Sequence, residues 1–335
     1  MIQLLIILFL LLAAELTYFR IADRFNIIDK PNERSSHSSV VLRGGGVIFI
    51  VGAWLYAAFY GVQLWPFLVG LSMIAGVSFV DDVKPLPDSV RLVVQFTAMG
   101  LMFYQWGILH WEYWCIVILG LILCVGIINA YNFMDGINGI TGGYSLAILI
   151  PLAWMNLKGG ASIAGFTDQN LIYVTILADL VFCFFNFRPR GKAKCFAGDV
   201  GSVGVAFILV YMVGALILKT GDFTYIMLLA LYGVDSVLTI VHRILLHENL
   251  GEAHRKHAYQ LMANELKIGH VKVSLLYMAM QLVVSLGFIY LCPSSVAAHW
   301  GYLVGATVVL AVAYVLFKKK YYHLHEEYLA GLKKS

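Results

Sequence analysis

The sequence predicts an all-α, polytopic membrane protein in which about 11 transmembrane helices form one bundle. The chain of 335 residues is 61% hydrophobic and only 13% charged. Its mean hydropathy of +0.82 is typical of a membrane protein and excludes an ordinary soluble domain. The apolar runs are continuous and approach the roughly 20 residues with which a helix crosses the hydrocarbon core. They lack the short alternating pattern of a membrane β-barrel.

Each span is placed where an apolar run begins and ends. The first run has no basic segment before it and no small-residue cleavage site, so we expect a retained helix and not a removed signal peptide. Neither an internal repeat nor a soluble insertion interrupts the series, and residues 1–335 are expected to form a single integral-membrane domain. The expected spans are 1–19, 44–62, 64–80, 90–107, 112–130, 139–157, 169–187, 201–218, 223–242, 273–292 and 296–317.

The basic residues predict the orientation of these spans. With eleven spans, 21 of the 23 Lys and Arg residues fall on one side, and only Lys158 and Lys219 fall on the other. Cytoplasmic loops carry the Lys/Arg excess, so the N-terminus is expected outside and the C-terminus in the cytosol. The net charge of +4 then follows from topology and anionic lipid headgroups, and no nucleic-acid partner is expected.

Polar clusters at the expected cytosolic ends of the spans are the main indication of function. Asp81 and Asp82 follow one apolar run and precede a turn at Lys84, Pro85 and Pro87. One carboxylate could bind a metal ion while the other accepts a proton from an attacking phosphate, with Lys84 among the candidate substrate-binding residues. The alternative is an ordinary solvated helix end.

The segment NAYNFMDGING ends a second span. Asn129, Asn132, Asp135 and Asn138 recur every three residues, which places them on one side of a helix end. Amides and a carboxylate there can hold a nucleotide-sugar or a hydrated metal ion. Helix capping and turn formation are the alternative, but four such residues exceed what capping needs.

The segment FAGDVGSVG is expected to open a helix. Its glycines allow a close backbone approach, and a helix N-terminus favours an anion. Asp199 does not fit a pure phosphate site, but it fits a phosphate site bridged by Mg²⁺; capping of the next span is the alternative. The preceding RPRGKAK run, residues 188–194, either sets topology or attracts a diphosphate or an anionic lipid headgroup.

The long loop 243–272 carries several histidines and basic residues. We expect His257 with Arg255 or Lys256 to recognise a phosphate, and the alternative is a solvated loop. A zinc site would need further ligands beyond His254 and His257, and no firm set is present. Residues 259–266 could form an interfacial helix on the membrane surface.

Three further acids lie inside, or near the end of, an expected span, and one loop precedes the second span. Asp179 and Asp235 lie inside expected spans, and an intramembrane acid is a functional candidate. Asp235 is within reach of the cytosolic clusters, Glu15 lies near the inner end of its span, and Asp179 has no obvious partner. The loop KPNERSSHSS before Arg43 and three glycines is expected to be an extended linker.

The order of these motifs resembles the polyprenyl-phosphate N-acetylhexosamine-1-phosphate transferases of glycosyltransferase family 4. DKPNERSSHSS…RGGG, VDDV, NAYNFMDGINGI, FAGDVGS and a histidine-bearing loop follow one another from about Asp29 to His270. The family includes undecaprenyl-phosphate N-acetylglucosamine-1-phosphate transferase and phospho-N-acetylmuramoyl-pentapeptide transferase. The third and fourth of these elements, NAYNFMDGINGI and FAGDVGS, are highly specific in this order, and the acidic pair by itself is not.

The resemblance implies a reaction and its partners. A membrane polyprenyl phosphate attacks the β-phosphate of a UDP-N-acetylamino sugar, giving polyprenyl-diphospho-sugar and UMP with Mg²⁺, for which Mn²⁺ could substitute. Asp199 matches the family's magnesium-binding aspartate, Asp81 and Asp82 its acidic pair, and Asn132 and Asp135 its nucleotide- and phosphate-proximal residues. Asp82 is also a candidate metal ligand. We favour direct attack over an aspartyl intermediate, because phosphoryl transfer mostly needs positioning and charge neutralisation.

One departure bears on the donor sugar. Many members carry His-x-His-His in the last cytosolic loop, whereas residues 257–260 read His-Ala-Tyr-Gln here. That form resembles a branch that initiates O-antigen, the polysaccharide of lipopolysaccharide, or capsule. We therefore expect an initiating transferase in the bacterial inner membrane with a cytosolic active site. A muramoyl-pentapeptide transferase and a membrane transporter are the alternatives, and a homodimer stays open.

Overall fold

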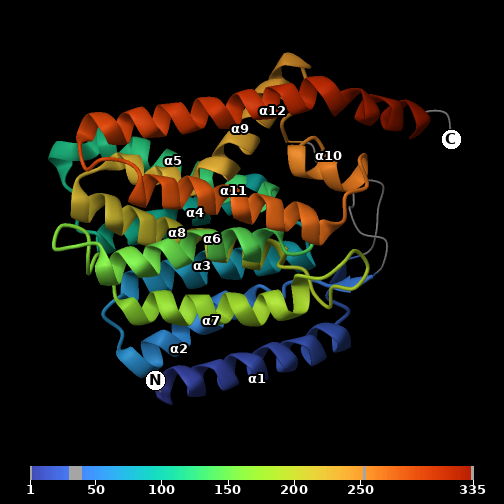
Figure 1. The fold of residues 1–335 in the computed structure, drawn as a ribbon. Coiled ribbons are helices and arrows are strands. Elements are labelled where there is room, and N and C mark those ends of the chain that lie inside the picture. The colour runs from blue at the N-terminus through green and yellow to red at the C-terminus, as the bar shows by residue number, and fades with distance from the viewer. Residues whose placement is uncertain (1, 30–39, 252–253, 333–335) are drawn as a thin grey trace.

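The computed structural model describes residues 2–29, 40–251 and 254–332, and in this part of the chain the protein is a bundle of long helices (Figure 1). Each of the eleven expected spans coincides with a helical segment, and among the described residues nine such segments are long and apolar enough to cross a membrane. The other two are α2, with 14 residues, and α4, which is less apolar. The chain is therefore a polytopic helical membrane protein.

The elements follow one another with short connections. The helices are α1 Ile2–Arg24, α2 Val47–Tyr60, α3 Trp65–Val83, α4 Asp88–Gln105, η1 Trp111–Tyr113, α5 Trp114–Phe133, α6 Ile140–Lys158, α7 Gln169–Asn186, α8 Gly198–Thr220, η2 Phe223–Leu229, α9 Ala230–Leu245, α10 Ala258–Asn264, α11 His270–Tyr290 and α12 Val296–Leu332. Two short strands, β1 Ile28–Asp29 and β2 Val41–Leu42, pair antiparallel.

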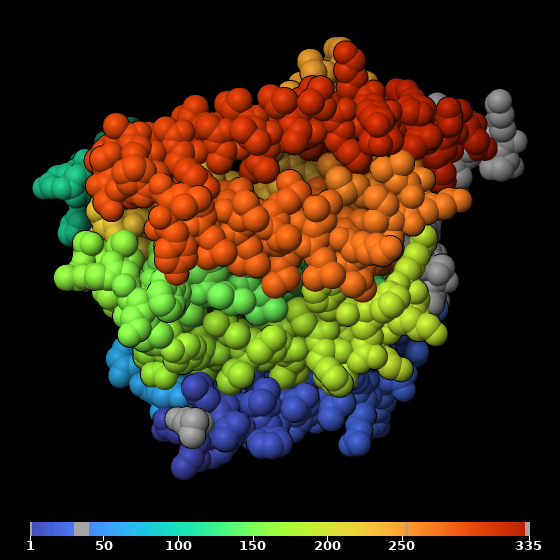
Figure 2. All heavy atoms as spheres, viewed as in Figure 1, coloured from blue at the N-terminus to red at the C-terminus, as the bar shows by residue number. Residues whose placement is uncertain are grey.

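Helix α8 is the centre of the bundle. It packs on α3, α5, α2 and α6, and most of its side chains are buried. Helices α5 and α12 instead expose most of their apolar side chains, as expected for helices that face lipid. Figure 2 shows α11 and α12 covering one flank of the bundle. The N-terminus of α8 lies against the end of α3 and the segment before α2.

The span that contains η2 and α9 is not a continuous α-helix. A 3₁₀ segment at Phe223–Leu229 precedes α9, and the change of helix type leaves backbone groups that must be satisfied away from water. Gln281 Oε1 accepts from the Leu231 N–H at 3.2 Å, and Tyr144 Oη accepts from the Tyr232 N–H at 3.2 Å. Side chains from α6 and α11 therefore stabilise this irregular start.

The glycine segment before α2 lies against the start of α8. Gly45 N–H donates to Phe196 O at 2.8 Å, and Gly46 N–H donates to Ala197 O at 3.1 Å. A side chain on Gly46 would collide with the backbone of Gly201, so two glycines make this approach possible. The segment expected to be a linker is thus, from Val41 onward, a packed element that fixes Arg43; residues 30–39 lie outside the described residues.

Two expectations about the last third of the chain were wrong. Helix α12 continues from the expected end at residue 317 to Leu332. Helix α10 forms within the expected interfacial segment, but Tyr259 and Leu261 are fully buried against the protein. Its apolar face packs on α11 and α12, so it is not available to the membrane surface.

Candidate functional site

The C-terminal end of α3 meets the N-terminal end of α8. Asp82 accepts hydrogen bonds from the backbone N–H groups of Asp199, at 2.9 Å, and Val200, at 3.0 Å. Gly198 adopts a positive φ of 70°, and a side chain there would collide with Asp82 Oδ2. The expected anion site at this helix terminus is therefore occupied by the carboxylate of Asp82, which comes from another helix.

Two arginines bridge three carboxylates at this junction. Arg43 Nε lies 2.7 Å from Asp82 Oδ1, and its Nη2 lies 3.6 Å from Asp199 Oδ1. Arg91 Nη1, on α4, lies 3.0 Å from Asp81 Oδ2 and 3.6 Å from Asp199 Oδ2. We name Asp81, Asp82, Asp199, Arg43 and Arg91 the acidic junction; the structure brings together the three aspartates that the sequence singled out.

The acidic junction fits a magnesium ion that is shared with substrate phosphates. Within residues 2–29, 40–251 and 254–332, no three His, Cys, Asp or Glu side chains are arranged to hold a metal by themselves. Mg²⁺ commonly takes one or two carboxylates and fills its other positions with water and phosphate oxygens. Asp199 is partly exposed, its two arginine contacts are long, and its carboxyl lies within hydrogen-bonding reach of Asp81. Asp82 is less suited, because Arg43 and two backbone amides already engage it.

The end of α5 adds two amides to the site. Asn132 Oδ1 accepts from the Ser202 hydroxyl at 2.8 Å, which ties it to the first turn of α8. Asn129 Nδ2 donates to Gln95 Oε1 at 2.9 Å, which ties it to α4. Both expected substrate-binding residues are therefore positioned by helices of the acidic junction.

Asp135 lies in the turn between α5 and α6. The hydroxyl of Thr141 donates to its Oδ1 at 2.5 Å. Burial raises the pKa of Asp135 to about 6, despite the opposing effect of the Thr141 hydrogen bond, and the negative charge of Asp82 contributes to the rise. A carboxyl group with this pKa can exchange a proton near neutral pH.

The side chain of Asn138 binds backbone groups and does not face the acidic junction. Its side-chain amide donates to the carbonyl oxygens of Arg188, at 2.9 Å, and Pro189, at 3.1 Å. Its backbone N–H donates to His270 Nδ1, and its carbonyl accepts from Ser274. Asn138 is only 2% exposed. It therefore fixes the turn that carries Asp135, and the structure does not bring its side chain to the acidic junction.

A polar cavity of about 450 Å³ opens beside the acidic junction. Arg91 belongs to both, because it lines the cavity and contacts Asp199. Asn132 lines the cavity as well and accepts a hydrogen bond from Ser202 in the first turn of α8. The cavity is lined by Asp88, Arg91, Leu92, Gln95, Asn129, Asn132, Phe133, Arg243, Leu250, Gly251, His254 and His257. Guanidinium, imidazole and amide groups from segments far apart in the sequence thus face one space, a composition suited to phosphates.

The histidine-bearing loop closes one side of this cavity. His257 Nδ1 lies 3.2 Å from Asp235 Oδ1 on α9, and the rings of His254 and His257 are 5.0 Å apart. Burial lowers the pKa of His254 to about 3, with help from the positive charges of neighbouring groups, so this ring is neutral at neutral pH. His254 Nδ1 accepts from the Lys256 N–H, and Nε2 of a neutral ring is then a donor.

Two expected substrate-binding residues lie apart from the cavity lining. Arg255 Nη2 binds Glu265 Oε1 at 3.0 Å, and its guanidinium stacks 4.4 Å from the ring centroid of Tyr328 on α12. Lys84 is exposed after the end of α3. The structure thus uses Arg255 to pack the loop against α12 and leaves Lys84 exposed, outside the cavity lining.

Sequence reasoning missed the arginines of the acidic junction. No site role was predicted for Arg43, Arg91 or Arg243, although Arg43 belongs to the RGGG motif and Arg243 lines the cavity. An arginine directly before three glycines was a usable signal for Arg43. The pairing of Arg91 with Asp81 depends on the angle between α3 and α4, which no local pattern encodes.

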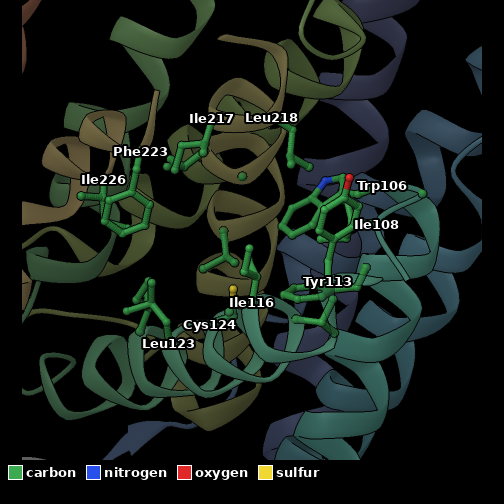
Figure 3. Close-up of a pocket in the computed structure, with 18 of the residues that line it drawn as sticks. Trp106, Ile108, Tyr113, Ile116, Leu123, Cys124, Ile217, Leu218, Phe223 and Ile226 are labelled. Carbon is green, nitrogen blue, oxygen red and sulfur yellow. The ribbon is translucent and has the colours of Figure 1, made fainter. Parts of the chain in front are cut away.

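A second cavity of about 450 Å³ is almost entirely apolar. Trp106, Ile108, Tyr113, Leu123, Ile217 and Phe223 are among the side chains around it in Figure 3. It is formed by α4, α5, α8 and η2, mainly toward the ends of these helices that lie away from the acidic junction. Its composition suits a hydrocarbon chain and no charged ligand.

Comparisons with known proteins agree with the motif order. Residues 64–217 match the family model described as glycosyl transferase family 4. The chain is 28% identical over 265 residues, 73% of this chain and 72% of the relative, to the "Probable undecaprenyl-phosphate N-acetylglucosaminyl 1-phosphate transferase" of Bacillus subtilis (strain 168).

Two further relatives match over shorter stretches. One is the decaprenyl-phosphate N-acetylglucosaminephosphotransferase of Mycobacterium tuberculosis (strain ATCC 25618 / H37Rv), at 27% identity over 59% of this chain. The other is the undecaprenyl-phosphate alpha-N-acetylglucosaminyl 1-phosphate transferase of Escherichia coli (strain K12), at 24% identity over 58% of this chain. The matches span 57% and 56% of these two relatives, respectively.

Proposed function

We propose that the chain is a member of glycosyl transferase family 4 and transfers a sugar 1-phosphate from a UDP-N-acetylamino sugar to polyprenyl phosphate, which the match of residues 64–217 to the family model supports. The products are polyprenyl-diphospho-sugar and UMP. The observation that carries this proposal is the acidic junction at the edge of a cavity lined by arginine, histidine and amide groups. The carboxylates would bind a divalent cation, and the arginine, histidine and amide groups would bind the diphosphate that accompanies it.

The bond changes define what the site must do. An oxygen of the lipid phosphate attacks the β-phosphorus of the donor, and the bond from that phosphorus to the bridging oxygen breaks, leaving UMP. Asp199, with Asp81 as a second carboxylate, would hold Mg²⁺, and the ion supplies charge neutralisation for the phosphate oxygens. Arg91 and Arg43 can rearrange from these carboxylates toward phosphate oxygens, since both guanidinium groups are partly exposed.

Asp135 is the proton acceptor that we propose for the lipid phosphate, because its pKa suits the exchange of a proton near neutral pH. The second pKa of a phosphate group is about 6, and burial raises the pKa of Asp135 to about 6 as well. Proton transfer between matched groups is efficient near neutral pH. Asp82 is less suited to this role, because Arg43 and two backbone N–H groups already engage both of its carboxylate oxygens.

The apolar cavity offers a place for part of the lipid chain. Helices α5 and α8 carry apolar residues of this cavity and, at their other ends, Asn132 and Asp199. A lipid lying along them would keep its hydrocarbon in the membrane and present its phosphate to the acidic junction. The names of the relatives support undecaprenyl or decaprenyl phosphate as the acceptor class and N-acetylglucosamine as the sugar.

The cellular role follows from this chemistry. UDP-sugars are cytosolic, so we place the acidic junction at the cytosolic face of the bacterial inner membrane, in agreement with the Lys and Arg distribution. The product is a lipid-linked monosaccharide phosphate, which suits the initiation of O-antigen or capsule.

The test is a donor panel. Purified protein is incubated with undecaprenyl phosphate, Mg²⁺ and, separately, UDP-N-acetylglucosamine, UDP-N-acetylgalactosamine or UDP-N-acetylmuramoyl-pentapeptide, and UMP and lipid product are measured. We expect equal amounts of UMP and lipid-linked sugar phosphate with an N-acetylhexosamine donor. Turnover of the pentapeptide donor alone would instead identify a peptidoglycan enzyme, and no UMP from any donor would refute the proposal.

A further inference from the structure

Asp235 is the most extensively bonded carboxylate inside the bundle, and the reaction described above does not use it. It lies on α9 and is 2% exposed. The hydroxyl of Tyr277 donates to Oδ2 at 2.6 Å, and the hydroxyl of Thr239 and the N–H of Ala258 approach Oδ1 at 3.2 Å. His257 Nδ1 lies 3.2 Å from the same Oδ1. A membrane helix thus holds a charged side chain against the histidine-bearing loop.

Within the part of the chain that the structure describes, the other nitrogen of His257, Nε2, has no hydrogen-bond partner. Nε2 is buried, and the ring lines the polar cavity. A buried polar atom without a hydrogen bond is energetically unfavourable. Such a cost is expected where a ligand supplies the missing partner, and the cavity next to the acidic junction is the space from which a ligand would reach this atom.

We propose that Asp235 is a positioning residue that orients His257 toward a phosphate of the sugar donor. It accepts the Nδ1 hydrogen, which fixes the ring so that Nε2 faces the cavity. When the ring is protonated, Nε2–H donates to a phosphate oxygen while Nδ1–H donates to Asp235, whose charge balances that of the ring. This inference rests on the proposed function and assigns Asp235 to donor binding.

The backbone of the loop is held by other contacts. Gln260 Oε1 accepts from the His257 N–H at 3.2 Å, and Tyr259 Oη donates to the carbonyl oxygen of Phe133 at 3.1 Å. Lys318 on α12 donates to the Lys256 carbonyl oxygen. Removing the charge of Asp235 is therefore expected to disturb the histidine ring more than the path of the chain.

A double-mutant cycle on full-length protein tests the inference, with UDP and Mg²⁺ as the probe and calorimetry as the measurement. We expect Asp235→Asn to weaken UDP binding by about tenfold in the wild-type background and by less than about threefold in the His257→Ala background. Coupling of this kind requires that Asp235 acts through His257. In UMP-release assays, Asp235→Asn should raise the KM for the UDP-sugar and leave that for undecaprenyl phosphate unchanged.

Asp179→Asn is the matched control, because it makes the same change at another fully buried aspartate, on α7, that contacts no histidine. It should leave UDP affinity unchanged. Equal weakening by Asp235→Asn in both backgrounds, or none in the wild type, would overturn the inference. UDP binding is measured without lipid acceptor, so the cycle stays decisive even if wild-type protein released no UMP, a result that would refute only the proposed function.

Discussion

Asp82 shows how one residue can connect two helices that are far apart in the sequence. It ends α3, yet its carboxylate binds the first free N–H groups of α8, 117 residues later. The N-terminus of a helix favours a negative charge, and Arg43 completes the arrangement with an ion pair. Asp82 therefore shapes the acidic junction, while Asp199 remains available to a ligand.

Asp82→Asn should lower stability more than Asp81→Asn does. The substitution leaves one oxygen but removes the buried charge that two amides and Arg43 share, so we expect a loss of about 2 kcal/mol. Asp81 is bound by Arg91 and the Leu86 N–H at the edge of the site, and its loss should cost less. Thermal unfolding in detergent measures both variants. Equal melting temperatures would contradict the structural role of Asp82.

Thr141→Val should move the acid limb of the pH profile. If Asp135 acts as a base, kcat/KM falls as the pH drops through about 6, because the carboxylate becomes protonated. Thr141 stabilises the carboxylate with its hydroxyl, so its removal raises the pKa of Asp135 further and shifts this limb to higher pH. UMP release from pH 5 to pH 8 at low donor concentration measures the shift.

Thr97→Val is the control for that change, because its hydroxyl bonds only to Val93 O in its own helix. Thr97→Val should leave the acid limb of the pH profile of kcat/KM at the same pH. A profile that Thr141→Val does not move would exclude Asp135 as the titrating base.

At the residue scale, the sequence predicted which residues belong to the site better than it predicted which residues they contact. Asp81, Asp82, Asn129, Asn132, Asp135 and Asp199 could be selected because carboxylates and amides gather at the ends of apolar spans on one expected side of the membrane. The sequence could not show that Arg255 has a structural role and not a substrate-binding one, because that role depends on its contacts with Glu265 and with Tyr328 on α12. Such pairings depend on the tertiary fold alone.

At the scale of elements, two glycine segments set the distance between Arg43 and α8. Gly46 and Gly201 let the start of α2 approach the backbone of α8, which brings Arg43 to Asp82. Gly46→Ala should therefore cost about 1–3 kcal/mol by overpacking and displace Arg43. We expect a clear loss of UMP release together with a lower melting temperature.

Gly126→Ala is the matched control on α5, because no atom lies within 4 Å of the added carbon. It should keep activity and stability. Wild-type activity in Gly46→Ala would show that the close approach does not position the site.

The helices themselves were largely predictable, because long apolar runs must form hydrogen bonds within one segment. All eleven expected spans are helical, with ends displaced by a few residues except at α12. The 3₁₀ segment before α9 was not predictable, since Tyr144 and Gln281 from other helices satisfy its neighbouring backbone groups.

At the scale of the whole molecule, the polar groups are concentrated at one end. The acidic junction, the polar cavity and the histidine-bearing loop join the ends of α3, α5, α8 and α9, whereas the apolar cavity lies mainly toward the other end. A secondary transporter usually binds substrate near the middle of the membrane. The observed arrangement suits a reaction at one membrane face.

The orientation of the bundle can be tested by cysteine labelling. In a variant without native cysteines, Glu112→Cys should react with a membrane-impermeant maleimide on intact cells, whereas Arg190→Cys should react only after the membrane is opened. Both side chains are exposed at opposite ends of the helices. The reverse pattern would contradict the predicted topology.

The central claim is that Asp199 and its neighbours gather a divalent cation and a nucleotide diphosphate for attack by a lipid phosphate. The most direct measurement is Mg²⁺-dependent UMP release from UDP-N-acetylglucosamine by wild-type protein, Asp199→Asn and Asp179→Asn in liposomes that contain undecaprenyl phosphate. We predict that Asp199→Asn lowers the rate of UMP release at least roughly 100-fold, as expected for loss of an essential electrostatic group, and leaves the melting temperature unchanged. Asp179→Asn should release UMP at a near-normal rate. Wild-type release by Asp199→Asn, or equal losses in the two variants, would contradict the account.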